Sequence, residues 1–263
     1  MSETQSSSGT QTTRAPVVAA LMIGRGGSSL KDKNILPVHG VPLLLWAAGA
    51  ARRSRYVTRF YASSDCPRIL ETAAIGGYRP IVRPDELAGD TAQSADAVRH
   101  ALPIIEQDGP VDIVVVQHAN VGTISEAQID ACIELLLANE AATAVVPSHQ
   151  HPEYHPMRAK RLMPDGSLGL FVHELGISAN RQDLPTAFFF DHSFWVLRGR
   201  RAIFDPQGQA PWPCMGSHIV PFETQGCKDV HDLADLETTA QWLLDNAIPR
   251  PFFLDEDATA PAI

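Results

Sequence analysis

The stretch PVVAALMIGRGGSSLKDKN, residues 16–34, joins a continuous apolar run to a loop of glycines, serines and basic residues. An apolar run without polar alternation is typical of a strand that is buried on both faces of a parallel sheet. The following segment, VPLLLWAAGAARRS at residues 41–54, has a helical pattern that opens near Pro42. This order of strand, glycine-rich loop and helix predicts the first unit of an α/β fold, with a loop that suits an anion.

The alternation of apolar runs and helical patterns continues along the chain. It predicts strands at 58–65, 78–83, 111–118 and 142–148, and helices at 67–77, 91–109 and 125–141, the last with Ser125 as N-cap. Such alternation predicts an α/β fold with a mostly parallel, doubly wound sheet and helices on both faces. Ligands of such sheets bind beyond the carboxyl ends of the strands, where the loop at 23–34 lies.

The domain organisation follows from where this pattern breaks. Residues 148–187 are rich in Pro, His, Gly and charged residues, which predicts an inserted subdomain or hairpin. Strand patterns return at 187–198 and 218–223, and a last helix is predicted at 233–247. The polar residues 1–15 and the last residues, 251–263, are expected to be tails, so that residues 16–250 form a single domain with one insertion.

Composition narrows the classes of partner. The 263 residues carry a formal net charge of -9, which disfavours non-specific binding to nucleic acid because such binding relies on clustered Lys and Arg. No apolar run approaches the ~20 residues that cross a bilayer, so no membrane partner is expected. The four cysteines show no zinc spacing, and together with the absence of a signal-peptide pattern they predict a cytoplasmic protein.

Two loops carry candidate chemistry. Arg25, Lys31 and Lys33 can neutralise a phosphate that approaches the backbone at the glycines, although a solvated glycine turn with surface lysines is an equally good reading. The segment KDVHDLADLE, residues 228–237, clusters acids before a helix. Such a cluster reflects either the charge preference of a helix N-terminus or a magnesium site, because Mg²⁺ prefers carboxylate oxygens.

Taken in order, several motifs resemble the cytidylyltransferases that activate acidic sugars, a family typified by CMP-sialic acid synthetases and including enzymes for 3-deoxy-manno-octulosonate, legionaminate and pseudaminate. The motifs are GRGGSSLKDKN at 24–34, GVPLLLWAA at 40–48, SSD at 63–65, RPDELAGDTAQS at 83–94 and RQDLPTAF at 181–188. The resemblance covers roughly residues 17–244. Each motif alone is weak, and their conjunction in this order is specific.

The resemblance implies roles for individual residues. It also implies a nucleotide-diphospho-sugar transferase-like fold and a homodimer formed through the insertion, in which each subunit contributes residues to the partner's site. Arg25, Lys31 and Asp229 are the expected catalytic residues. The expected CTP-binding residues are Gly26, Gly27, Ser28, Ser29, Lys33, Asn34, Arg83, Ala92 and Ser94, and the expected sugar-binding residues are Gln117, Arg158 and Arg181.

The resemblance also implies Mg²⁺, with Mn²⁺ as a possible substitute, held by Asp229 together with His231 or Asp232. Here the sequence departs from the family, whose metal motif is D-x-D where this chain reads DVHD. Other departures are Ser29 in place of lysine, QHANVGTI at 117–124 in place of QPTSPLR, Phe189 in place of arginine, and Asp191-His192 in place of Asn-Gly.

The predicted function is transfer of CMP from CTP to an acidic α-keto sugar, with release of pyrophosphate. Two alternatives remain. One is an altered or silent relative that binds nucleotide or sugar without turnover, which His231 and QHANVGTI favour. The other is an enzyme of the same fold that uses a sugar 1-phosphate, against which the cytosine-type motif RPDELAGDTAQS argues.

Overall fold

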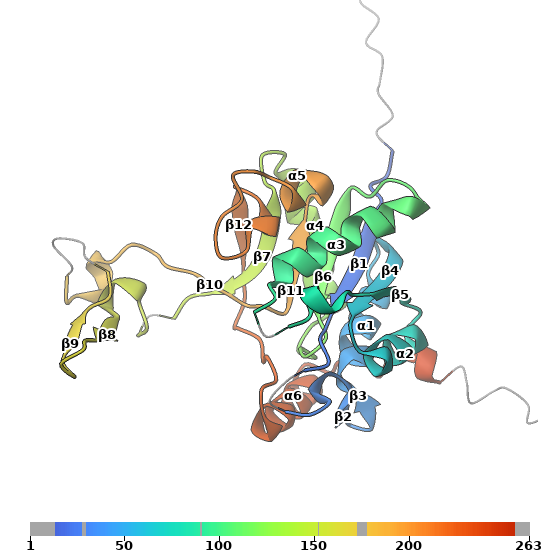
Figure 1. Ribbon diagram of the computed structural model, residues 1–263, viewed down its shortest axis with the longest axis horizontal. Coiled ribbons are helices and arrows are strands. Elements are labelled where there is room, and N and C mark those ends of the chain that lie inside the picture. Colours follow the sequence, from blue (N-terminus) through green and yellow to red (C-terminus); the bar gives the residue numbers. More distant parts are fainter. Residues whose placement is uncertain (1–13, 28–29, 90, 152, 173–177, 256–263) are drawn as a thin grey trace, which may run out of the picture.

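A mixed sheet forms the centre of the molecule in the computed structural model, which describes residues 14–27, 30–89, 91–151, 153–172 and 178–255 (Figure 1). Within these residues the sheet has eight strands in the order β10-β7-β11-β6-β1-β4-β5, and β12 pairs with β7. The strands are β1 (Val18–Ile23), β4 (Val57–Ser64), β5 (Arg79–Val82), β6 (Ile113–His118), β7 (Ala144–His149), β10 (Phe189–Phe190), β11 (Phe194–Leu197) and β12 (Ile219–Glu223). The predicted α/β fold with a mostly parallel sheet is confirmed, since β5, β4, β1 and β6 pair in parallel.

The apolar run at β1 is buried on both faces, as its lack of alternation predicts. Its residues alternate between two cores, with Val18, Ala20 and Met22 in one and Ala19, Leu21 and Ile23 in the other. β6 divides in the same way, because successive strand side chains point to opposite faces. The centre of the sheet is therefore covered on both sides, and only the strand ends are left for a ligand.

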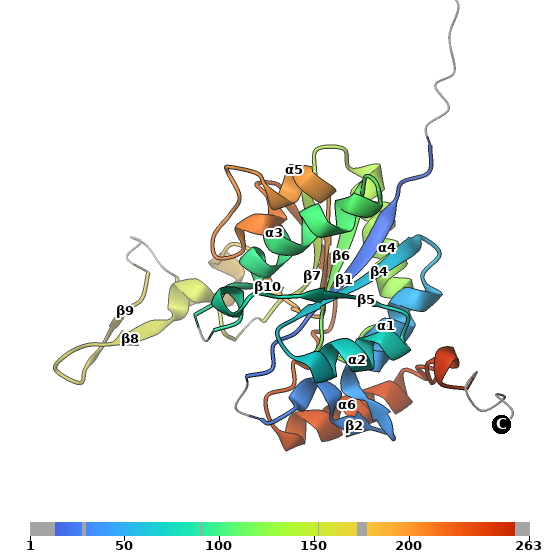
Figure 2. The ribbon, with the colours of Figure 1, turned by 45° about the vertical axis from the view of Figure 1, so that its right-hand side comes forward.

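Helices cover the two faces of the sheet (Figure 2). Those packed in the core with Val18 are α1 (Leu43–Arg53), α2 (Pro67–Ile75) and α4 (Glu126–Ala138), while α3 (Ser94–Ile105) and α5 (Gly199–Ile203) pack in the other core. Ser125 caps α4 through a capping box with Gln128, as predicted. α3 begins at Ser94, inside the predicted range, and the Ala92 N–H just before it bonds the Gly89 carbonyl at 3.0 Å.

The strand predicted at 187–198 is divided in two. β10 pairs with the end of β7, and β11 lies antiparallel between β6 and β7. Residues 191–193 join them, and the Asp191 N–H bonds the Pro147 carbonyl at 2.8 Å. The chain therefore bends at Asp191 and His192, and this bend lies beside the carboxyl end of β6.

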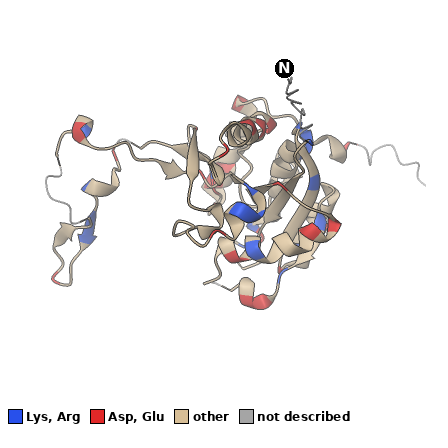
Figure 3. Cartoon of the chain, turned by 90° about the horizontal axis from the view of Figure 1, so that it is seen from above, with Lys and Arg blue, Asp and Glu red and all other residues tan. Residues whose placement is uncertain are grey.

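The insertion extends from the body as an arm (Figures 1 and 3). It contains the antiparallel pair β8 (Lys160–Leu162) and β9 (Leu168–Leu170), which agrees with the predicted hairpin. Away from the arm, α6 (Leu233–Asp245) packs beside the small hairpin of β2 (Pro37–Val38) and β3 (Val41–Pro42). Most of the two predicted tails lies outside the described residues. Residues 251–255 do not behave as a tail, because Pro251 is buried and packs against α1 at Gly49.

All four cysteines are free thiols in the structure. No helix among the described residues is long and apolar enough to cross a membrane.

Candidate active site

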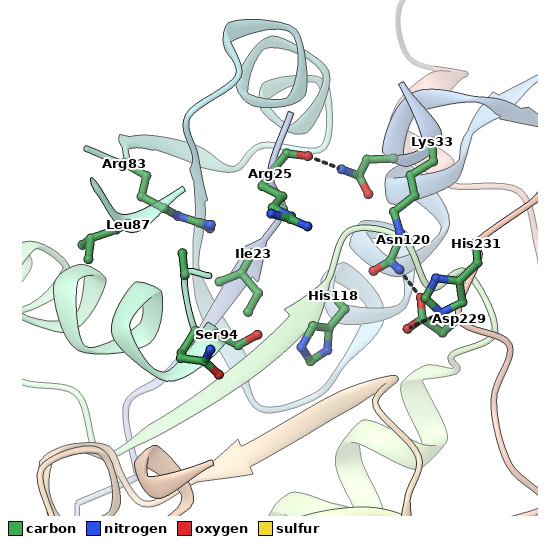
Figure 4. A pocket seen from close by; sticks show the side chains of 14 residues that line it. Ile23, Arg25, Lys33, Arg83, Leu87, Ser94, His118, Asn120, Asp229 and His231 are labelled. Atoms are coloured by element: carbon green, nitrogen blue, oxygen red, sulfur yellow. Dashed lines mark hydrogen bonds and ion pairs between the residues drawn. The ribbon is translucent and has the colours of Figure 1, made fainter. Parts of the chain in front are cut away.

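A cavity of about 360 Å³ opens at the carboxyl ends of β1, β5 and β6 (Figure 4). It is lined by Ile23, Gly24, Arg25, Lys33, Asn34, Arg83, Leu87, Ala92, Gln93, Ser94, His118, Asn120, Asp229 and His231. Eight of the predicted site residues, which come from segments as far apart as residues 25 and 231, therefore meet at this cavity. They are Arg25, Lys33, Asn34, Arg83, Ala92, Ser94, Asp229 and His231.

The loop after β1 is held in place by its neighbours. The Gly24 N–H bonds the Ser63 carbonyl at 3.2 Å, and the Gly26 N–H bonds Asp65 Oδ1 at 3.0 Å. In addition, Asn34 Nδ2 donates to the Arg25 carbonyl at 3.0 Å. The SSD motif at the end of β4 and the buried Asn34 thus fix the course of the loop. Ser28 and Ser29 lie outside the described residues.

Three basic side chains line the cavity. Arg83 is 6% exposed, and its Nε and Nη2 donate to the Ser63 hydroxyl and carbonyl at 3.2 and 2.6 Å. Burial lowers the pKa of its guanidinium, which stays charged because arginine starts from 12.5. Arg25 Nη1 donates to the Gly89 carbonyl at 3.1 Å, and Lys33 reaches the cavity from the far side (Figure 4).

The acidic group lies on the same side of the cavity as Lys33 and across from Arg83 (Figure 4). Asn120 Nδ2 donates a hydrogen bond to Asp229 Oδ1, and His231 Nε2 lies 3.3 Å from Asp229 Oδ2. Burial raises the pKa of the Asp229 carboxyl, and the nearby His231 and Lys33 oppose this shift. A bridge between Val121 and Asp229 joins this segment to the end of β6. Asp229 is the single carboxylate among the described lining residues, against three cations. The cavity therefore favours an anion although the chain as a whole is acidic.

His118 and Asn120 line the cavity, but the sequence did not predict them as site residues. His118 is the last residue of β6, and its ring packs edge-on against Trp195 with centroids 4.7 Å apart. Burial lowers its pKa to about 3, so that the imidazole is neutral near pH 7. Strand alternation was the available signal, because it turns His118 toward the face opposite to Gln117.

Several expected site residues lie elsewhere. Gln117 is fully buried, with its amide bonded to the Tyr78 hydroxyl and the Ala47 carbonyl, so its side chain ties the core together and does not face the cavity. Asp232 caps α6 by accepting from the Asp235 N–H at 3.0 Å. The remaining described residues do not line the cavity either: Gly26 and Gly27 lie in the loop, Lys31 is exposed beyond it, and Arg158 and Arg181 are on the arm.

The single carboxylate among the described lining residues suits a magnesium ion that takes most of its ligands from substrate phosphates and water. Within the described part of the chain no cluster of three His, Cys, Asp or Glu side chains could enclose a metal. Mg²⁺ is usually bound through one or two carboxylates, with substrate phosphates and water completing the shell. Asp229 offers one such carboxylate, on the side of the cavity where Lys33 also lies and across from Arg83 (Figure 4).

Sequence comparison identifies the family. The model of the cytidylyltransferase family matches residues 19–192. A pseudaminic acid cytidylyltransferase of Campylobacter jejuni subsp. jejuni serotype O:23/36 is 27% identical over 174 residues, which is 65% of this chain and 74% of that protein. An N-acylneuraminate cytidylyltransferase of Escherichia coli O18:K1:H7 is 31% identical over 91 residues, 35% of this chain. The alignments span only 22% of that protein and 27% of the N-acylneuraminate cytidylyltransferase A of Danio rerio.

Solved structures show the same fold. A CMP:2-keto-3-deoxy-manno-octonic acid synthetase complexed with CTP superposes with a TM-score of 0.64 at 16% identity, covering 88% of this chain and 99% of the other. A 4-diphosphocytidyl-2C-methyl-D-erythritol synthase of Anaerococcus prevotii gives a TM-score of 0.62 at 11% identity, covering 88% and 97%. With the family match over residues 19–192, the chain belongs to the cytidylyltransferase family.

Proposed function

We propose that the protein transfers CMP from CTP to an acidic α-keto sugar of the nonulosonate type, with release of pyrophosphate. One observation carries the proposal: among the described lining residues, Arg25, Lys33 and Arg83 converge with one carboxylate on a cavity at the carboxyl ends of the parallel strands. A triphosphate is the kind of ligand that such a charge arrangement binds. The names of the sequence relatives supply the sugar class.

In the proposed reaction a hydroxyl oxygen of the sugar attacks the α-phosphorus of CTP. The new bond joins that oxygen to phosphorus, the bond from the α-phosphorus to the β-phosphate oxygen breaks, and the proton of the hydroxyl is released to solvent. Such chemistry depends mainly on positioning and on neutralising charge. Arg25 and Lys33 take the role of neutralising the phosphates and the departing pyrophosphate, while Arg83, Ala92 and Ser94 form the base side of the cavity.

Magnesium is proposed as the cofactor, with Mn²⁺ as a substitute. Asp229 holds the ion, His231 lies beside this carboxylate, and Asn120 orients it by a hydrogen bond. When bound, the ion supplies positive charge that screens the triphosphate.

A second copy of the chain is the proposed partner of the arm. Leu162, Leu168 and Phe171 on the arm are 74%, 70% and 63% exposed, which is unusual for apolar side chains that gather on one small hairpin. Arg158 and Arg181 lie on the same arm and do not line the cavity of their own chain. A dimer in which each arm lends them to the partner's site accounts for both facts.

Complementation tests this dimer. Arg25→Ala and Arg181→Ala variants are each expected to be impaired, and mixing them after reversible dissociation gives heterodimers with one intact composite site. Random assortment in a two-fold dimer should restore roughly a quarter of the native activity. A mixture that stays as inactive as its parts, or a chain that sediments as a monomer, contradicts the exchange of arm residues.

Pyrophosphate release tests the activity itself. The protein is incubated with Mg²⁺, CTP and a panel of eight- and nine-carbon α-keto acids, and in parallel with sugar 1-phosphates and each of the four nucleoside triphosphates. Release that needs CTP and a keto acid supports the proposal. Release only with a sugar 1-phosphate identifies the second activity. Thermal stabilisation by CTP without any release identifies a binding protein, since a ligand of the native state stabilises it whether or not it reacts.

A further inference from the structure

A cavity of about 340 Å³ lies at the end of the sheet where β1 and β6 begin and β11 ends. α5 lies at this end, beside the start of β1 (Figure 1). The charged residues that line it are Asp112, Arg198, Arg200 and Arg201. None of them lines the cavity of Arg25 and Asp229, the polar cavity, which opens at the other end of β1 and β6. The motifs shared with the cytidylyltransferases include none of these four residues.

Two of the four charged side chains are already neutralised by neighbours. Arg200 forms an ion pair with Glu106, in which Arg200 Nη2 lies 2.7 Å from Glu106 Oε2. Arg14 Nη2 lies 2.7 Å from Asp112 Oδ1. The charge of the cavity is therefore set by the remaining two side chains, which are both arginines.

Arg198 and Arg201 have no such counterion. Within the described part of the chain, no carboxylate oxygen lies within 4.0 Å of either guanidinium. Burial and the charge of Arg201 lower the pKa of Arg198, and the more distant Glu140 carboxylate opposes this shift. Two like charges that face each other in a partly dry cavity repel, and an anion that binds between them relieves this repulsion.

Backbone carbonyls hold both guanidiniums in place. Arg198 donates three hydrogen bonds of 2.6–2.9 Å and Arg201 donates two, of 2.7 and 3.1 Å, all to carbonyls of residues 136–142 at the carboxyl end of α4. These carbonyls carry no net charge, so they orient the guanidiniums without neutralising them. A guanidinium has five N–H donors, so neither arginine uses all of its donors on the protein. Such fixed, planar donor groups are suited to the oxygens of a phosphate.

We propose that this cavity, the arginine cavity, binds an oxyanion of the phosphate type at a site separate from the polar cavity. A diphosphate carries enough negative charge to neutralise both free arginines, whereas a single carboxylate neutralises one. The volume of 340 Å³ equals that of about eleven water molecules at about 30 Å³ each, which leaves room for a diphosphate. The inference does not depend on the proposed function, although pyrophosphate, the product of that reaction, is an anion of this class.

Pyrophosphate binding tests the arginine cavity. The full-length protein is titrated calorimetrically with sodium pyrophosphate in EDTA, without nucleotide, and in parallel with sodium acetate at the same ionic strength. Two equivalents of pyrophosphate are expected to bind each chain, one in the polar cavity and one in the arginine cavity. Arg25→Ala should weaken the first equivalent alone. Arg201→Gln should weaken the second alone, by roughly 10- to 100-fold, the loss expected for a charge-assisted hydrogen bond.

The choice of variants keeps the test independent of folding. The Arg201 side chain is exposed, and so are Glu140 and Ala141, whose carbonyls would turn to water in Arg201→Gln. Arg198→Lys is the second variant, because it keeps the charge and loses the planar fork, and it should also weaken the second equivalent. Arg250→Gln is the matched control, because it removes the same charge from an exposed side chain that does not line the arginine cavity.

The outcomes separate the arginine cavity from the proposed activity. An equivalent that is weakened in Arg201→Gln and retained in Arg25→Ala and Arg250→Gln supports the arginine cavity, whether or not the polar cavity binds pyrophosphate. Binding that is unchanged in Arg201→Gln, or weakened equally in Arg250→Gln, overturns it, and so does acetate binding as tight as that of pyrophosphate. Loss of the equivalent that depends on Arg25 bears only on the proposed function.

Discussion

Gly24 lies so close to Ala119 that a Cβ at Gly24 would come within 2.8 Å of the Ala119 Cβ. Gly24 follows β1 and Ala119 follows β6, and the Ala119 N–H bonds the Ile23 carbonyl at 2.9 Å. The two strand ends are therefore in direct backbone contact at the floor of the polar cavity. By contrast, a Cβ at Gly27 would meet nothing within 4 Å among the described atoms.

This difference predicts that alanine destabilises the protein at Gly24 and has almost no effect on stability at Gly27. Gly24→Ala should lower the free energy of unfolding by about 1–3 kcal/mol, because the added carbon must push β1 and β6 apart. Gly27→Ala should change it by no more than about 0.5 kcal/mol. If the loop backbone approaches a phosphate at Gly27, that variant should nevertheless bind CTP more weakly. Urea denaturation and CTP titration of both variants check this, and equal stabilities would contradict the close contact at Gly24.

The architecture was predictable because its signals are local. The apolar run of β1 and the capping box at Ser125 each specify one element, and their alternation specifies the parallel sheet. The bend at Asp191 and His192 was not predictable. Both flanking segments are aromatic and apolar, and only pairing with β6 and β7, which are distant in sequence, decides where one strand ends and the next begins.

The candidate site was predictable in part, because some of its residues also belong to short local motifs. Arg25, Arg83 and Asp229 belong to motifs, and each follows a strand or precedes a helix at the expected edge of the sheet. His118 was missed because the motif at 117–124 is altered, so that resemblance pointed to Gln117. The strand pleat turns Gln117 into the core, where its amide is satisfied by Tyr78 and Ala47.

Arg25 provides the next prediction. Arg25→Ala should weaken CTP binding by about 1.5–3 kcal/mol, the usual contribution of a charge-assisted hydrogen bond, with little change in stability. Lys31→Ala is the matched control, because the Lys31 side chain is exposed and does not line the cavity. Calorimetric titration of both variants measures the difference. If Lys31→Ala lost more CTP affinity than Arg25→Ala, Lys31 would have the catalytic role that the motif implies.

His118 predicts a pH dependence of stability. Its folded-state pKa is about 3, against 6.5 for the ordinary imidazole, because burial disfavours the charged form. As the pH falls below 6.5, the imidazole is protonated in the unfolded chain before it is protonated in the folded one. This group therefore lowers the free energy of unfolding by up to about 1.4 kcal/mol per pH unit, until the pH reaches about 3. His118→Phe keeps a ring against Trp195 without titrating. Its stability should fall less steeply than that of the native chain between pH 6.5 and 4, as chemical denaturation at each pH would show. Parallel curves would mean that His118 is not buried as a neutral ring.

In the acidic segment before α6, we expect two aspartates to have different roles, one in metal binding and the other in helix capping. Asp229 lines the cavity, whereas the Asp232 carboxylate accepts the Asp235 N–H at 3.0 Å. Asp229→Asn should therefore raise the Mg²⁺ concentration needed for half-maximal activity. Asp232→Ala should lower stability by about 0.5–2 kcal/mol with the metal requirement unchanged, and Asp232→Asn should preserve both, because asparagine is an equally good N-cap.

His231→Asp completes this test, because it places an oxygen ligand beside Asp229 where the native chain has an imidazole 3.3 Å away. Mg²⁺ prefers oxygen, and Mn²⁺ accepts imidazole more readily. The variant should therefore use Mg²⁺ better than the native chain does, and the native chain should gain more from Mn²⁺. Activity is titrated against each metal for all four variants. If Asp232→Asn, and not Asp229→Asn, changes the metal requirement, the ion is held three residues further along the chain. In that case the cap observed at α6 must give way when the ion binds.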